Sequence, residues 1–164
     1  MPRTPVNGHS LEQQSGRAST TIEPARPADV DAVAAIEVTA FADPWTRPAF
    51  DAAVRERHAR FRVARSGGKI VGYVIAWFVL DEGEIANLAV APAARRRGVA
   101  SALLDFVIAD ARNSGIAQLF LEVRESNVAA RALYATRGFK PVARRPRYYR
   151  KPVEDAIVLR LELT

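Results

Sequence analysis

The chain has 164 residues, enough for one domain with a hydrophobic core of its own. It contains no cysteine, and its two histidines, His9 and His58, are isolated, which excludes disulfides and thiolate chemistry and argues against a metal site or a catalytic triad. The formal net charge of +6 favours an anionic partner (nucleic acid, a ribosome surface or a phosphate-rich cofactor), although a basic surface also simply aids solubility.

Residues 1–19 mix Pro, Gly, Ser, Gln and Arg without periodicity, and we interpret them as a disordered tail before a single domain at 20–164. This segment lacks the apolar stretch of a secretory signal, and no part of the chain reaches the roughly 18–20 apolar residues of a membrane span. We therefore expect a cytoplasmic protein that does not bind membranes.

The first half of the predicted domain contains four strands and two helices. The strands are expected at 20–24, 61–65, 69–79 and 84–90, with Ser66-Gly67-Gly68 as a hairpin turn. One helix is expected at 28–41, where apolar residues recur at helical spacing, and a second runs from a cap at Thr46 to about Arg57.

After Pro92 the pattern predicts a long helix that ends near Gly115, and then the strand 117–123. Ser126 is expected to cap the next helix, which ends before Gly138, and strands follow at 139–143 and 156–163. This order predicts an α/β (α+β) fold with a central mixed, mostly antiparallel sheet of about seven strands and helices on both faces. The two late β-α-β passages imply some parallel pairing.

The segment Arg95-Arg96-Arg97-Gly98-Val99-Ala100 joins a strand to the long helix. Its small residues let a ligand approach the backbone, and the free amides of the helix start favour a pyrophosphate there. It is neither a Walker P-loop nor a Rossmann fingerprint, because their glycine patterns are missing. An ordinary basic loop before a helix would give the same pattern.

Two blocks resemble the GNAT family of N-acetyltransferases across about 20–163. Arg95-x-x-Gly98-x-Ala100 is similar to the family's Gln/Arg-x-x-Gly-x-Gly/Ala motif, and Asn127-x-x-Ala130-x-x-Leu133-Tyr134-x-x-x-Gly138-Phe139 is similar to a second family segment. The resemblance implies the GNAT fold, in which a splayed parallel strand pair holds acetyl-CoA. It also implies an acetyl-CoA-dependent N-acetyltransferase that uses no metal.

The same resemblance implies roles for individual residues. Glu122 would be the general base, and Tyr134 the general acid that protonates the departing thiolate. The residues expected to bind acetyl-CoA are Leu88, Ala89, Val90, Arg96, Arg97, Gly98, Val99, Ala100, Ser101 and Asn127. Alternatives remain: Glu122 as a strand-end carboxylate paired with an arginine, Tyr134 as a core aromatic with a bonded hydroxyl, and Asn127 as a first-turn residue.

Leu121-Glu122-Val123-Arg124-x-Ser126-Asn127 is typical of the bacterial ribosomal-protein-alanine N-acetyltransferases within this family. This narrower resemblance implies an enzyme that acetylates the N-terminal alanine of a small-subunit ribosomal protein. The lack of cysteine favours direct attack in a ternary complex, and we expect a monomer. Trp45, Tyr148 and Tyr149 would then shape the acceptor groove, or they simply pack. Acetylation of lysine or small amines, and a non-catalytic acetyl-CoA-binding module, stay open as alternatives.

Seven basic residues and no acidic one occupy residues 137–151. The segment is either a solvated rim, a contact for the 3′-phosphate of CoA, or a surface that approaches ribosomal RNA. No nucleic-acid-binding motif accompanies it, so we do not expect direct binding of nucleic acid beyond proximity to the ribosome.

Overall fold

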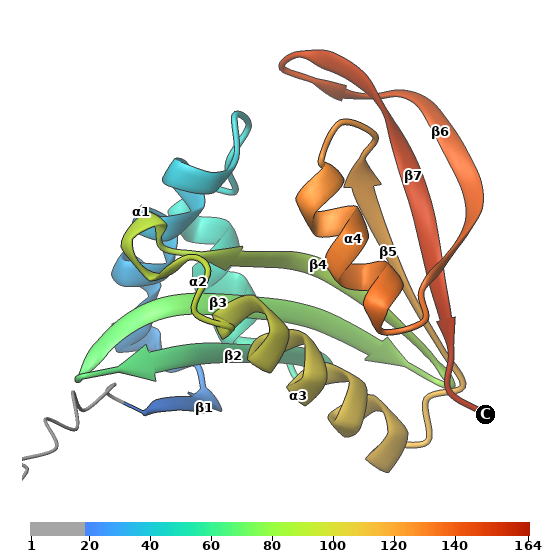
Figure 1. Cartoon of the computed structure of the whole chain (residues 1–164). Helices are drawn as coiled ribbons and strands as arrows, with labels where there is room; N and C mark the ends of the chain where they lie inside the picture. Colours follow the sequence, from blue (N-terminus) through green and yellow to red (C-terminus); the bar gives the residue numbers. More distant parts are fainter. Residues whose placement is uncertain (1–18) are drawn as a thin grey trace, which may run out of the picture.

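The computed structural model describes residues 19–164 (Figure 1), so the predicted tail lies outside the described residues except for Ser19. Seven strands form one sheet in the order β1-β2-β3-β4-β5-β7-β6, which confirms the predicted mixed sheet. The strands are β1 (Thr20–Pro24), β2 (Ala59–Ser66), β3 (Lys69–Val79), β4 (Glu82–Val90), β5 (Gln118–Arg124), β6 (Lys140–Arg150) and β7 (Val153–Glu162). The helices are α1 (Val30–Ala40), α2 (Arg47–Arg55), α3 (Val99–Asn113) and α4 (Val128–Thr136).

The helices cover the two faces of the sheet over separate cores. On one face, α1 and α2 bury Val30, Val33 and Phe50 against β2 and β3. On the other face, α3 packs over β2, β3 and β4, and Tyr134 of α4 joins the same apolar cluster as residues of β5 and β7. The helix α3 contributes apolar residues at helical spacing: Val99, Leu103, Leu104, Val107, Ile108 and Ala111. Because both faces are covered, the edges and gaps of the sheet are where a ligand can reach the backbone.

The most informative feature of the sheet is the parallel pair β4–β5. The two strands pair only from Glu82 opposite Gln118 to Ile85 opposite Leu121, and beyond this point they separate (Figure 1). In the neighbouring pair, β3 residues 75 and 76 lie opposite β4 residues 87 and 85, so Ala86 is an extra residue in a β-bulge. The bulge therefore lies where the strands begin to diverge.

The second β-α-β passage does not give the expected parallel pairing. After α4 the chain crosses to the outer edge as β6, and β7 returns antiparallel between β6 and β5. The strands β6 and β7 form an antiparallel hairpin, and β7 is the member that lies beside β5. Within the described sheet, β4–β5 is consequently the one parallel pair.

Helix capping follows the prediction at one site and differs at the other. The Thr46 hydroxyl accepts a hydrogen bond from the Ala49 amide at 3.3 Å, as expected for an N-cap of α2. The cap of α4 is Asn127, whose Oδ1 accepts from the Ala130 amide at 3.1 Å, and not Ser126. The Ser126 amide instead donates to Glu154 on β7 at 2.6 Å, which ties the start of the helix to the sheet.

Among the residues that the structure describes, no helix is both long enough and apolar enough to span a membrane. The same residues contain no group of His, Asp and Glu side chains suited to holding a metal ion.

Candidate active site

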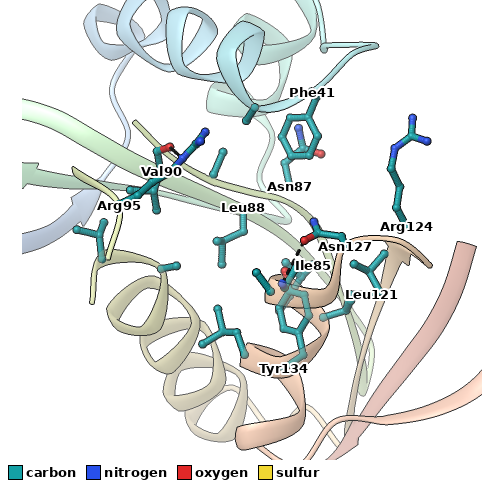
Figure 2. A pocket seen from close by; sticks show the side chains of 18 of the residues that line it. Phe41, Ile85, Asn87, Leu88, Val90, Arg95, Leu121, Arg124, Asn127 and Tyr134 are labelled. Carbon is teal, nitrogen blue, oxygen red and sulfur yellow. Dashed lines mark hydrogen bonds between the residues drawn. The ribbon is translucent and has the colours of Figure 1, made fainter. Parts of the chain in front are cut away.

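A cavity of about 630 Å³, which we call the first cavity, opens between the separated ends of β4 and β5 (Figure 2). Beyond Ile85, the edge of β4 that faces β5 has no strand partner, so its backbone groups are free to bind a ligand. Nine of the ten residues predicted to bind the cofactor line this cavity: Leu88, Ala89, Val90, Arg96, Gly98, Val99, Ala100, Ser101 and Asn127. The tenth, Arg97, does not line it.

The turn before α3 has a backbone suited to an anion. Arg96 and Gly98 adopt left-handed conformations with φ of 63° and 80°. A non-glycine residue is uncommon in this region and is found most often at functional turns. Arg95 braces the turn, because its Nε donates to the carbonyl of Val90 at 3.3 Å. Arg95 also lines the cavity. The sequence placed it in the motif but not among the residues expected to bind the cofactor.

The start of α3 presents unused amides to the same cavity. The carbonyl of Gly98 accepts the helical hydrogen bond of Ala102 at 3.0 Å, so the amides of Val99, Ala100 and Ser101 precede the first helical hydrogen bond. Their donors and the positive end of the helix dipole favour a negatively charged group. This end of the first cavity can therefore hold a pyrophosphate.

Tyr134 of α4 lines the first cavity (Figure 2). Its side chain is 8% exposed and packs against Phe139 with ring centroids 5.6 Å apart. Burial raises the pKa of Tyr134 to about 12, so the hydroxyl keeps its proton at neutral pH. No described residue forms a hydrogen bond with this hydroxyl. Tyr134 is thus a core aromatic whose hydroxyl is free to donate.

Glu122 of β5 lines both the first cavity and a second cavity of about 620 Å³. The second cavity lies among the β3–β4 turn, β5, β6 and β7, and its walls include Trp77, Phe120 and Val158. The Nε of Arg145 lies 2.7 Å from Oε1 of Glu122, and the nearby Glu122 carboxylate raises the pKa of the Tyr148 hydroxyl. Glu122 is therefore paired with an arginine and also faces both cavities.

The three aromatic residues predicted to bind the acceptor lie in different places. Tyr148 lies near Glu122, and Tyr149 lines the first cavity with its ring 5.2 Å from that of Tyr148. Trp45 instead packs on Phe50 in the core under α1 and α2, with ring centroids 5.5 Å apart. The structure therefore brings the two tyrosines, but not Trp45, beside Glu122.

The contacts of Arg124 were not predicted from the sequence. It donates to the carbonyls of Lys151 and Pro152 at 3.0 and 3.1 Å, and it lies 4.3 Å from the centroid of the Tyr149 ring. It thereby fixes the tip of the β6–β7 hairpin over the end of β5. Its place directly before the α4 segment was visible in the sequence, but its partners are about 25 residues away.

The sequence profile of the acetyltransferase (GNAT) family matches residues 30–139. This chain belongs to the GNAT family. The first cavity thus contains the turn and helix start that resembled this family in sequence, and the predicted GNAT fold and acetyl-CoA-dependent N-acetyltransferase class are confirmed.

Individual GNAT proteins match over nearly the whole domain. The [ribosomal protein bS18]-alanine N-acetyltransferase of Escherichia coli strain K12 is 38% identical over 146 residues, covering 88% of this chain and 98% of that protein. The N-alpha-acetyltransferase RimI of Mycobacterium tuberculosis is 37% identical over 139 residues, covering 81% and 86%. A crystal structure of the Escherichia coli ribosomal-protein-S18-alanine N-acetyltransferase superposes with a TM-score of 0.84 at 35% identity, covering 89% and 95%.

Proposed function

We propose that this GNAT enzyme transfers an acetyl group from acetyl-CoA to the α-amine of the N-terminal alanine of small-subunit ribosomal protein bS18. The observation that carries the proposal is Glu122, which lies where the two cavities meet. Acetyl-CoA would occupy the first cavity and the protein N-terminus the second. The relatives named for this reaction match over almost their full length, which supports the choice of acceptor.

The residues of the first cavity fit acetyl-CoA at both ends. The amides of Val99, Ala100 and Ser101 would bind the pyrophosphate, and the open edge of β4 would bind the amide groups of pantetheine as an added strand does. Leu88 and Leu133 supply an apolar wall near Tyr134. When bound, acetyl-CoA supplies the activated acetyl group as a thioester.

Glu122 would take the proton that the acceptor must lose. An α-ammonium group has a reference pKa of about 7.7–8.0, whereas that of a lysine side chain is about 10.4. At neutral pH the α-ammonium group therefore loses its proton, and becomes a nucleophilic amine, at a smaller free-energy cost than lysine. A carboxylate in hydrogen-bonding reach accepts this proton directly or through one water molecule. The lower cost for an α-amine favours a protein N-terminus over a lysine side chain as the acceptor.

Tyr134 would give its proton to the sulfur that leaves. The raised pKa of Tyr134 keeps the hydroxyl protonated, and its lack of a bonded partner leaves it available to a ligand in the first cavity. Because the chain has no cysteine to carry an acetyl group, we propose direct transfer from acetyl-CoA to the amine in a ternary complex. A ribosomal acceptor further implies a cytoplasmic location.

A panel of acceptors tests the proposal through the rate of CoA release. The panel contains peptides that begin with alanine, the same peptides blocked at the α-amine, lysine-bearing blocked peptides, and spermidine. We expect turnover on the free peptides and a rate at background on their blocked counterparts. Turnover confined to lysine or spermidine would keep the enzyme class and reject the proposed acceptor.

A further inference from the structure

Glu84 of β4 lies beside Glu122 in the second cavity, and the proposed chemistry gives it no role. In the parallel register Glu84 is opposite Phe120, two residues before Glu122 on β5. Ile85 and Leu121 point into the core under α3, so Glu84 and Glu122 project from the opposite side of these strands. The two carboxylates therefore flank the start of the gap between β4 and β5.

The two carboxylates have different surroundings. Glu122 is paired with Arg145, whereas Glu84 is exposed to solvent and has no hydrogen-bond or ion-pair partner among the described residues. Partial burial and the charge of Glu122 raise the pKa of Glu84, and Arg145 opposes this shift. The β3–β4 turn adds Asp81 and Glu82 to the cavity wall, where Arg145 is the single basic residue.

An α-ammonium group is suited to bind between Glu84 and Glu122. It carries three N–H donors and one positive charge, and a second carboxylate can accept one donor while Glu122 accepts another. Two neighbouring carboxylates repel each other, and a cation bound between them attracts both and offsets the repulsion. The charge of Arg145 reaches Glu84 only at longer range, because its guanidinium forms its ion pair with Glu122.

We infer that Glu84 is an acceptor-binding residue that hydrogen-bonds to the α-ammonium of the incoming protein N-terminus beside Glu122. The inference rests on the proposed function. One proton moves from nitrogen to the Glu122 carboxylate, and the neutral amine then forms the C–N bond as the C–S bond breaks and Tyr134 gives its proton to the sulfur. The nitrogen loses its second surplus proton as the amide forms, and this proton returns through water to the Tyr134 oxygen. Glu84 stays bound to a remaining N–H and orients the nitrogen lone pair.

The test measures kcat and KM for a peptide that begins with alanine, at saturating acetyl-CoA. The variants are Glu84→Gln, Glu84→Asp as the conservative change, and Glu162→Gln as a matched control on an exposed carboxylate of β7 outside both cavities. We expect Glu84→Gln to raise the peptide KM about tenfold, the scale of one charge-assisted hydrogen bond, with the KM for acetyl-CoA unchanged. Glu84→Asp recovers part of the loss, and Glu162→Gln matches the wild type.

The outcomes separate this inference from the function on which it rests. A wild-type enzyme that leaves the peptide unmodified overturns the proposed function and the inference together. A wild-type enzyme that acetylates it, with Glu84→Gln giving the same kinetic constants, overturns the inference alone. Equal rises in KM for peptide and for acetyl-CoA in Glu84→Gln also overturn it, because they indicate a general disturbance of the fold.

Discussion

Tyr134 and Glu122 reach the first cavity from α4 and β5, and their surroundings suit opposite proton transfers. Tyr134 is buried among apolar groups, which raises the pKa of its hydroxyl to about 12 and keeps it a proton donor. Glu122 stands in a polar setting, where the ion pair with Arg145 favours the ionised carboxylate. An ionised carboxylate and a protonated hydroxyl are the forms that the proposed base and acid require.

Replacing Tyr134 by phenylalanine removes the hydroxyl and keeps the ring that packs on Phe139. We expect kcat to fall about 100-fold, at the lower end of general acid contributions, with the melting temperature and the KM for acetyl-CoA near those of the wild type. Steady-state kinetics and thermal unfolding check this. An unchanged kcat would show that Tyr134 is only a packing residue.

Glu122→Gln keeps the size of the side chain and removes the proton acceptor. We expect kcat/KM to fall on the order of 100-fold at pH 7 and to recover partly as pH rises past about 8, because acceptors that are already neutral need no base. A pH–rate profile of both enzymes measures this. A variant with the wild-type profile would contradict the role of Glu122 as base.

Glu37 of α1 is a buried carboxyl outside the proposed chemistry, 1% exposed. It accepts from the Trp45 amide and from Asn87, each at 3.0 Å, and from the hydroxyl of Tyr73. Burial raises the pKa of Glu37, and its hydrogen bonds oppose the shift. It connects the loop after α1 to β4 beside the first cavity.

Because the pKa of Glu37 is higher in the folded protein, the folded state holds this proton more tightly than the unfolded state. The free energy of unfolding therefore falls as pH rises from about 4.5 through the raised pKa. In Glu37→Gln we expect this part of the pH dependence to disappear, as measured by denaturant unfolding at several pH values. Parallel pH profiles for the two proteins would contradict the assignment.

At the scale of elements, the turn before α3 depends on the left-handed conformation of Gly98. No atom lies within 4 Å of the position that an added methyl group would take there, so a Gly98→Ala change is opposed by backbone strain alone, about 1–2 kcal/mol. Relief of the strain would move the amides at the start of α3. We expect the KM for acetyl-CoA to rise severalfold, as measured by steady-state kinetics.

Gly67→Ala is the matched control for Gly98→Ala. Gly67 is also left-handed, with φ of 57° and no atom within 4 Å of an added methyl group, but it lies in the β2–β3 turn, outside the first cavity. We expect a similar loss of stability with an unchanged KM for acetyl-CoA. Equal effects of both changes on that KM would contradict a specific role for the turn before α3.

The sequence predicted the order of elements and most of the first cavity, because these depend on local periodicity and on motifs within short segments. It did not predict that Asn127 rather than Ser126 caps α4, since adjacent polar residues can both serve as caps. The position of β7 between β5 and β6, and the contacts of Arg124 and Arg145 with distant segments, depend on pairing across the sheet. Local patterns carry no information on that pairing.

At the scale of the whole molecule, three of the seven basic residues along 137–151 are neutralised by ion pairs. Arg137 pairs with Asp105 at 2.9 Å, Arg144 with Glu125 at 2.8 Å, and Arg145 with Glu122 at 2.7 Å. Four basic residues have no ion-pair partner among the described residues: Lys140, Arg147, Arg150 and Lys151. Arg145 of the segment thus contacts a proposed site residue, and the four basic residues without an ion-pair partner stay available for a phosphate or an RNA surface.

The arrangement of two cavities that meet at Glu122 makes one measurement decisive. A single peptide with an N-terminal alanine and an internal lysine is incubated with enzyme and acetyl-CoA, and tandem mass spectrometry locates the acetyl group. The account predicts acetylation of the α-amine, with the lysine unmodified at equal exposure to the enzyme. An acetyl group on the lysine of a peptide whose N-terminus is still free would contradict it.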